Sequence, residues 1–251
     1  MSLQACADLV QRGDPDRFLA AMAAPVAARR VLFPLYAMAI EVARAPWVTE
    51  EPMIAEMRLH WWRDALEESA EGRDVRKHEV TTPLAEAISP DTARALDRMV
   101  AARRWDIYKD AFEDEDHFAD YLEATGGVLM WAAAENLGAA PSARSDVCAF
   151  GAATALTRFL AAVPELEARG RIPLVDGRPE AIRALAETAH AQLPSDRQLL
   201  HLRAIKARAA LLEGWQTRPI LRQIIKDPHR VVAGALGLSP IRKRARLIRW
   251  A

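Results

Sequence analysis

The sequence has little of what marks an extracellular, a membrane-spanning or a nucleic-acid-binding protein. Only two of its 251 residues are cysteines, Cys6 and Cys148, which excludes a disulfide framework and indicates a reducing compartment. The uncharged runs at residues 18–28 and 31–40 each contain a proline and fall well short of the roughly 20 residues that cross a bilayer. With 34 basic and 34 acidic side chains, the formal net charge is zero, which predicts no nucleic-acid partner and no global attraction to anionic lipid.

Targeting and catalytic motifs are scarce as well. No basic segment followed by an apolar one opens the chain, so no secretory signal is apparent, and we expect a soluble, cytoplasmic protein. A peripheral contact with the inner membrane stays open. No two histidines lie four residues apart, and neither a glycine-rich phosphate loop nor a Gly-x-Ser-x-Gly sequence occurs. These absences exclude the usual zinc-binding helix, the P-loop and the hydrolase nucleophile elbow.

The sequence does contain helical patterns along its whole length. Ala, Leu and Arg dominate, and these residues lead the scale of helix propensity. Residues 54–67 form an amphipathic segment with Trp61 on its apolar face. Ser89-Pro90 combines a capping hydroxyl with proline at the first helical position. Because no run alternates with a period of two and no long linker occurs, we predict an all-α fold of about ten helices in one domain, residues 1–251.

Five short stretches of the sequence resemble a known family. They are Phe18 … Arg29-Arg30 … Tyr36-Ala37, Leu59-His-Trp-Trp62-Arg63, Arg104-Trp105-Asp106-Ile107, Tyr121 … Thr125-Gly126-Gly127, and Arg169-Gly170-Arg171. In this order they resemble the squalene/phytoene synthase family, over a region from Asp14 to about Leu174. The resemblance implies the isoprenoid-synthase fold, in which helices surround a long apolar cavity with metal ions at its mouth.

The two aspartate-rich metal motifs of that family have no acidic counterpart here. Where the family has Asp-Asp-x-x-Asp, this sequence has Ala43-Arg44-Ala45-Pro46-Trp47. At the positions of the second motif it has Ala155, Arg158, Ala161, Ala162 and Leu166. Since Mg²⁺ needs hard oxygen ligands to hold a diphosphate, we expect no metal site and no cofactor. Mg²⁺ enters only if the chain is an enzyme with an altered site.

Two other groups of charged residues allow alternative interpretations. Arg44 and Arg158 stand at expected ligand positions, and an arginine can bind a diphosphate directly through its paired N–H groups. They can equally be ordinary surface or salt-bridged arginines. Asp106-x-x-x-Asp110 and Asp116-x-x-x-Asp120 have the spacing of a relocated metal site. Acids at helix starts are usually solvated, which is the interpretation we favour for both pairs.

Candidate ligand-binding residues follow from the resemblance, at the mouth and walls of the expected cavity. No catalytic residue is assigned. For one of the candidates, Trp62, packing in the core and contact with a surface or a partner are equally open, whereas its neighbour Trp61 is expected in the core. The candidates are Phe18, Tyr36, Arg44, Trp62, Arg158, Arg169 and Arg171.

A chain that keeps the scaffold without the metal ligands resembles the branch of the family that includes a mitochondrial complex I assembly factor. This resemblance implies a non-catalytic binding or assembly protein near a membrane, with a protein partner there and a lipid or isoprenoid in the cavity. One alternative is a divergent transferase that uses a prenyl diphosphate, and another is a carrier of isoprenoids or other lipids. An open apolar cavity would favour a lipid ligand, and a filled one would favour a scaffold.

The last segment, residues 239–250, places five basic side chains in one predicted helix. Ile241, Ala245 and Ile248 form a stripe along it. A basic amphipathic helix with Trp250 near its end can lie on an anionic membrane, which is the peripheral contact we consider. The alternative is a solvated basic helix docked on the domain.

Overall fold

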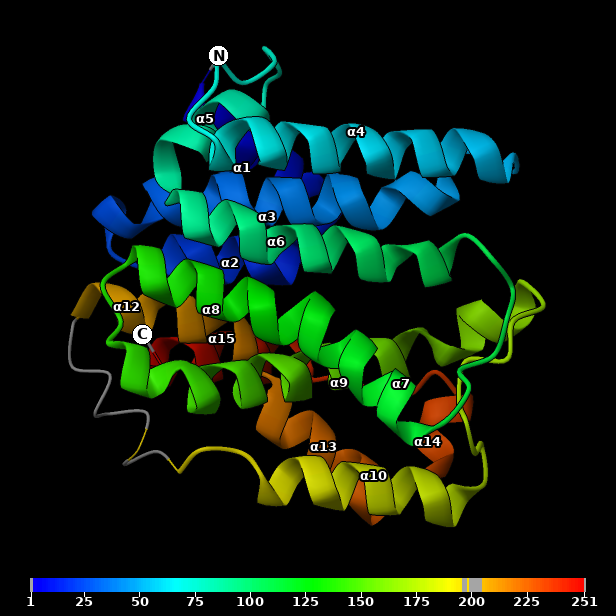
Figure 1. Ribbon diagram of the computed structural model, residues 1–251. Helices are drawn as coiled ribbons and strands as arrows, with labels where there is room; N and C mark the ends of the chain where they lie inside the picture. Colours follow the sequence, from blue (N-terminus) through cyan, green and yellow to red (C-terminus); the bar gives the residue numbers. More distant parts are fainter. Residues whose placement is uncertain (1, 196–197, 199–204, 251) are drawn as a thin grey trace.

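Every regular element of the described residues is helical, which confirms the all-α prediction (Figure 1). The structure, a computed structural model, describes residues 2–195, 198 and 205–250, with residues 205 and 206 described by their backbone alone. Ten of the helices have nine residues or more. They are α1 (Leu3–Gly13), α2 (Pro15–Ala23), α3 (Arg29–Arg44), α4 (Pro52–Ala70), α6 (Pro90–Ala102), α8 (Val128–Asn136), α9 (Arg144–Ala168), α10 (Pro179–Ala191), α13 (Thr217–Lys226) and α15 (Pro240–Trp250).

Shorter elements connect these helices. The remaining α-helices are α5 (Thr81–Ala87), α7 (Glu115–Leu122), α12 (Ile205–Leu211) and α14 (His229–Val232). Single turns of 3₁₀-helix are η1 (Val26–Ala28), η2 (Ala45–Trp47), η3 (Arg103–Asp106), η5 (Pro141–Ala143) and η6 (Leu212–Gly214), and η4 (Glu123–Gly127) is a π-helical turn.

Helix starts follow the capping chemistry of the sequence. The Ser89 hydroxyl accepts a hydrogen bond from the Thr92 amide at 3.2 Å, with Pro90 as the first residue of α6. The Asp14 carboxylate accepts from the Arg17 amide at 2.9 Å and opens α2. These side chains satisfy amide groups that the first turn of a helix leaves free.

The core lies around the middle of α3, which is buried on all sides. Nine consecutive residues, 32–40, are buried, and α3 packs against α1, α2, α5 and α8. In Figure 1, α4, α3 and α6 form the upper half of the molecule, α8 and α9 lie below them, and α10 and α13 close the bottom. A helix that is apolar all round is expected at such a central place.

Helix α9, with the turn before it, is long and apolar enough to cross a membrane by length and composition alone. This segment is Pro141–Ala168, and 56% of its most apolar window is buried inside the domain. The central helix of a globular core meets the same two criteria, so the burial explains the composition.

A π-helical turn joins α7 to α8, at the place where the sequence carries Thr125-Gly126-Gly127. The Thr125 hydroxyl donates to the Tyr121 carbonyl at 2.7 Å within this turn. A Cβ atom on Gly126 would lie 2.5 Å from the Cβ of Ala155, and nearer still to the carbonyl oxygen of Gly151. The glycines therefore allow the backbones of η4 and α9 to touch.

The expected inward face of α4 was wrong by one position. Trp62, not Trp61, is the buried tryptophan, with 5% of its surface exposed, and Met57 points to solvent with 65% exposed. Trp61 is half-buried and packs edge-on against Trp62, with ring centroids 5.1 Å apart. Two apolar stripes compete on this helix, and the buried residues are Ala55, Leu59, Trp62, Ala65, Leu66 and Ala70.

Candidate functional site

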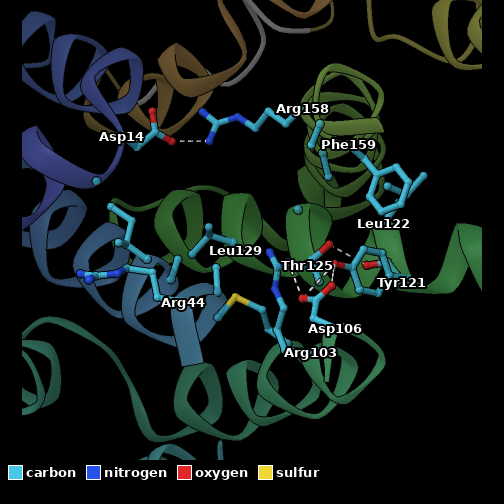
Figure 2. A pocket seen from close by; sticks show the side chains of 18 of the residues that line it. Asp14, Arg44, Arg103, Asp106, Tyr121, Leu122, Thr125, Leu129, Arg158 and Phe159 are labelled. Carbon is cyan, nitrogen blue, oxygen red and sulfur yellow. Dashed lines mark hydrogen bonds and ion pairs between the residues drawn. The ribbon is translucent and has the colours of Figure 1, made fainter. Parts of the chain in front are cut away.

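A cavity of about 410 Å³ opens between α3, α6, α9 and the η4 turn (Figure 2). Its volume falls within the range of small-molecule sites in proteins. The cavity is open rather than filled by side chains, which is the outcome that favours a ligand. Much of its wall is apolar, contributed by Ala39, Ile40, Met99, Leu122, Leu129, Phe159 and Leu166.

Residues from the positions where the family resemblance places its two metal motifs line this cavity. Ala43 and Arg44 come from the end of α3, and Ala155, Arg158, Ala162 and Leu166 come from α9. At these positions the two helices present side chains that are apolar or cationic.

One polar cluster on the wall joins the N-terminal segment to α9 and η6. It consists of Asp14, Arg17, Arg158 and Glu213. Arg158 Nη1 lies 2.5 Å from Asp14 Oδ2, and Arg158 Nη2 lies 3.7 Å from Glu213 Oε1. Arg17 donates two hydrogen bonds to Glu213 Oε1, from Nε at 3.1 Å and from Nη2. Two cations and two anions leave the cluster without net charge.

The opposite charges of this cluster stabilise the ionised forms of Asp14 and Arg17. Burial of Asp14 opposes its ionisation, but Arg158 and Arg17 outweigh burial and lower the pKa of the carboxyl to about 2. Burial likewise opposes the charge of Arg17, and Glu213 and Asp14 outweigh it, so the pKa of the guanidinium is raised. Asp14 and Arg17 are therefore charged near neutral pH.

Tyr36, one of the predicted site residues, lies beneath this cluster and does not line the cavity. Its side chain is fully buried, and the Arg17 guanidinium lies 5.1 Å from its ring centroid. Its hydroxyl has no hydrogen-bond partner among the described residues. Burial, with Glu213 nearby, raises the pKa of Tyr36 well above its ordinary value, so the phenol stays neutral.

A second polar cluster, Arg103, Asp106 and Tyr121, faces the cavity from the other side (Figure 2). Arg103 Nη1 donates to Asp106 Oδ2 at 3.0 Å and to the Tyr121 hydroxyl oxygen at 2.8 Å. The Tyr121 hydroxyl donates to Asp106 Oδ1 at 3.0 Å. Burial, with Asp106 beside the ring, raises the pKa of Tyr121. This cluster is also neutral overall.

The acids that could have formed a relocated metal site do not converge. Asp106 is buried in its ion pair, whereas Asp110, Asp116 and Asp120 are exposed. Across residues 2–195, 198 and 205–250, no three His, Cys, Asp or Glu side chains come together in a way that could hold a metal ion. The residues of this cavity therefore do not fit Mg²⁺.

The mouth of the cavity carries Arg44, Arg169 and Trp47. Arg44 is 62% exposed and lies 3.6 Å from Glu41, a weak contact. Arg169 pairs with Glu165 at 2.7 Å, and its guanidinium lies 4.8 Å from the Trp47 ring centroid. Trp47 was not among the predicted ligand-binding residues, although an exposed aromatic side chain is a common binding element.

Arg171, another predicted site residue, holds the η3 loop instead of lining the cavity. It is 7% exposed and donates to the backbone carbonyls of Trp105 at 3.3 Å, Tyr108 at 2.7 Å and Asp106. Burial lowers the pKa of its guanidinium. By fixing this loop, Arg171 positions Asp106 toward Arg103 and Tyr121.

The structure thus brings three of the seven predicted residues, Arg44, Arg158 and Arg169, to the cavity. Phe18 is half-buried and packs against Phe33, with ring centroids 5.8 Å apart, so neither it nor Trp62 reaches the cavity wall. Sequence reasoning missed Arg17 and Glu213. Arg17 stands beside Phe18 and after the Asp14 cap, a usable signal, but no local pattern marks Glu213.

Comparison with known proteins agrees with the fold and with the family resemblance. The sequence profile described as squalene/phytoene synthase matches residues 10–175. A protein of Drosophila melanogaster, named NADH dehydrogenase (ubiquinone) complex I, assembly factor 6 homolog, is 27% identical over 179 residues. The match covers 68% of this chain and 53% of that protein, so the chain spans about half the length of this relative.

Two solved structures share the architecture over nearly the whole chain. A dehydrosqualene synthase in complex with ligand superposes with a TM-score of 0.68 at 16% identity, covering 99% of this chain and 94% of the other. Squalene synthase HpnC from Alicyclobacillus acidocaldarius superposes with a TM-score of 0.59 at 15% identity, covering 98% and 92%. At these identities the two structures establish the fold.

Proposed function

The chain belongs to the squalene/phytoene synthase family, and we propose that it is a non-catalytic member that holds an apolar ligand in its cavity and assists a protein assembly. The observation that carries the proposal is the composition of the two facing helices. Where the family's chemistry needs metal-binding carboxylates, the wall consists of Ala43, Arg44, Ala155, Arg158 and Ala162. Ionising a prenyl diphosphate requires stabilisation of the leaving group, which these side chains do not supply through a metal.

The acids that do line the cavity support the same conclusion, because each is already engaged. Asp14, Asp106, Glu165 and Glu213 all lie in ion pairs with arginine. Recruiting Asp14, Asp106 or Glu213 to a metal would leave a buried or half-buried arginine without its partner, and breaking a buried pair typically costs about 3–5 kcal/mol.

The assembly part of the proposal comes from the relative that is named an assembly factor. The match runs over about half of that protein, so we propose a protein partner without identifying it. The open apolar cavity favours a bound lipid or isoprenoid over a purely structural core.

Calorimetric titration with farnesyl diphosphate and Mg²⁺ tests the non-catalytic proposal. We expect no saturable, metal-dependent binding and no release of pyrophosphate, with a dehydrosqualene synthase as the positive control. Metal-dependent binding followed by pyrophosphate release would establish the alternative, a divergent prenyl-diphosphate transferase in which Arg44, Arg158 and Arg169 hold the phosphates.

Mass spectrometry of lipid that co-purifies with the protein tests the ligand proposal. The matched variant is Ala162→Phe, which places a bulky ring into the cavity from α9. We expect an apolar molecule in the wild-type preparation and its loss in the variant, provided that circular dichroism shows the same helix content. An equal lipid content in both preparations would contradict binding in this cavity.

We also propose a peripheral membrane contact through α15. Lys243 pairs with Asp16 at 2.6 Å, and Trp250 stacks on Phe150 with centroids 5.9 Å apart, so one face of the helix docks on the domain. The opposite face exposes Ile241 (81%) and Ile248 (79%).

Three exposed arginines flank this isoleucine stripe on the two sides of the helix. Arg242, Arg244 and Arg249 have no ion-pair partner within the described residues, and α15 contains no acid. Near an anionic bilayer each arginine contributes about 1 kcal/mol, and the isoleucines can enter the apolar boundary. Charge and apolarity thus favour an anionic lipid surface.

Sedimentation with vesicles tests the contact. We expect the protein to sediment with phosphatidylglycerol-containing vesicles but not with pure phosphatidylcholine, and Ile248→Asp to abolish this. The control is Val232→Asp, because Val232 is an exposed aliphatic residue on α14. Equal sedimentation of both variants would refute the membrane contact. Dimerisation that depends on protein concentration and is prevented by Ile248→Asp but not by Val232→Asp would also refute it, because the isoleucine stripe would then bind a second copy of the chain.

A further inference from the structure

The charge distribution of the cavity identifies the kind of molecule that it takes. We infer that the ligand is an uncharged alcohol with an aliphatic body, and that Glu213 accepts a hydrogen bond from its hydroxyl group. This inference rests on the proposed function and adds to it the chemical class of the ligand and the residue that recognises its polar end.

Carboxylates engage the arginines of the cavity, most of them through hydrogen bonds and Arg44 through a weaker contact. Five arginines line it, and each lies within 4.0 Å of a carboxylate; they are Arg17, Arg44, Arg103, Arg158 and Arg169. A diphosphate would have to separate these pairs before an arginine could bind it, and it would then face the displaced carboxylates at close range. An uncharged molecule leaves every pair intact.

Glu213 supplies the second, independent observation. Its side chain is 5% exposed, and it lines the cavity. Its Oε1 atom accepts both hydrogen bonds from Arg17 and is also the atom nearest Arg158. Its Oε2 atom is buried and has no hydrogen-bond partner among the described residues.

A buried carboxyl oxygen that is paired with arginine through its other oxygen requires a donor of its own. A buried acceptor without a partner is costly, and a hydrogen bond to a charged group is stronger than one between neutral groups. A ligand hydroxyl can donate to Glu213 Oε2. A diphosphate ester or an ether has only acceptors near its polar end, so it would place one acceptor against another.

The rest of the wall suits an aliphatic body. The apolar wall includes Ile40 of α3 and Met99 of α6, together with Leu129 of α8 and Phe159 of α9. Burial of branched aliphatic carbon against such side chains contributes roughly in proportion to the area removed from water. The cavity therefore combines one acceptor with an extended apolar surface.

Titration with three matched probes tests the inference: farnesol, farnesyl methyl ether and farnesyl diphosphate. Binding is followed by calorimetry, and by the intrinsic fluorescence of the seven tryptophans, of which Trp47 lines the cavity. We expect farnesol to bind at least about tenfold more tightly than the methyl ether, because the ether lacks only the donor. We expect the diphosphate to bind more weakly than farnesol, with or without Mg²⁺.

Glu213→Gln makes the test specific to one oxygen. The amide retains the shape of the side chain but can present an N–H group where Oε2 was, so the preference for farnesol over the ether should fall to about unity. The control is Glu135→Gln, because Glu135 is a partly buried acceptor bonded to Thr92 and lies outside the cavity. Its preference should equal that of the wild type.

The outcomes separate the inference from the proposed function. Three results would overturn the inference that the ligand is an alcohol: equal binding of farnesol and the ether, tighter binding of the diphosphate, or an unchanged preference in Glu213→Gln. The proposal of an apolar ligand would not be affected by them. Absence of binding by all three probes would overturn both. If Glu213→Gln does not fold, the comparison of the three probes on the wild-type protein still decides.

Discussion

Replacing Gly126 by alanine should destabilise the protein, because this residue sets the distance between η4 and α9. The new Cβ would lie 2.5 Å from the Cβ of Ala155, whereas ordinary contacts begin at 3.4 Å. The two segments must therefore separate by about 1 Å. The closest obstacle is the backbone carbonyl of Gly151, which cannot rotate away as a side chain can.

Two opposing effects decide the magnitude. Overpacking of this kind costs about 1–3 kcal/mol, and alanine regains up to about 1 kcal/mol of helix propensity. We expect a net loss of about 1–2 kcal/mol in the free energy of unfolding, or roughly 2–8 °C in Tm for a chain of this size. Because Gly126 also lines the cavity, the shift should weaken ligand binding as well.

Thermal and urea unfolding, followed by far-UV circular dichroism, measure the loss. The matched control is Gly177→Ala, because a Cβ on Gly177 meets no atom within 4 Å and its backbone needs no positive φ. We expect the control to equal or slightly exceed the stability of the wild type. Equal stability of Gly126→Ala and the control would show that the contact between η4 and α9 is looser than described.

Three further predictions concern the core, the loop that Arg171 holds, and the dependence of stability on pH. Trp62→Ala should lower the free energy of unfolding by about 3–5 kcal/mol, against about 1–2 kcal/mol for Trp61→Ala, because Trp62 is buried and Trp61 only half-buried. Urea denaturation measures both losses. The reverse order would show that Trp61 faces the core, as the sequence predicted. Arg171→Met should lower the free energy of unfolding by about 1–3 kcal/mol, because three loop carbonyls lose their donor. The control Arg169→Met removes only an exposed i,i+4 ion pair and should cost below about 0.5 kcal/mol. Equal Tm values for the two variants would show that Arg171 does not stabilise the loop. The Asp14 carboxyl, with its pKa lowered from 3.8 to about 2, should add about 2 kcal/mol of stability above about pH 5. A lowered pKa favours the folded state only while the carboxyl is ionised in the unfolded chain. The stability difference between wild type and Asp14→Asn should therefore shrink as the pH falls from about 4 toward 2. A stability difference that does not depend on pH would argue against a role for the Asp14 carboxyl.

The site shows where sequence-based reasoning works and where it ends. The family resemblance placed Arg44 and Arg158 at the cavity, and both line it in the structure, because residues at fixed spacings on a helix keep their place on its face. Tyr36 and Arg171 were misplaced because a motif residue can support the site from beneath instead of facing it. Tyr36 lies under Arg17, and Arg171 grips backbone carbonyls behind the wall.

The sequence by itself determined the all-α class, the family and the cap that begins α6 at Ser89-Pro90. Each depends on local spacing, propensity or residue identity, which a linear pattern records. Only the tertiary structure decided that Arg17 pairs with Glu213, 196 positions away, and that one oxygen of that carboxylate has no partner among the described residues. Such pairings depend on how helices that are distant in sequence pack against each other, and helical periodicity carries no information about that packing.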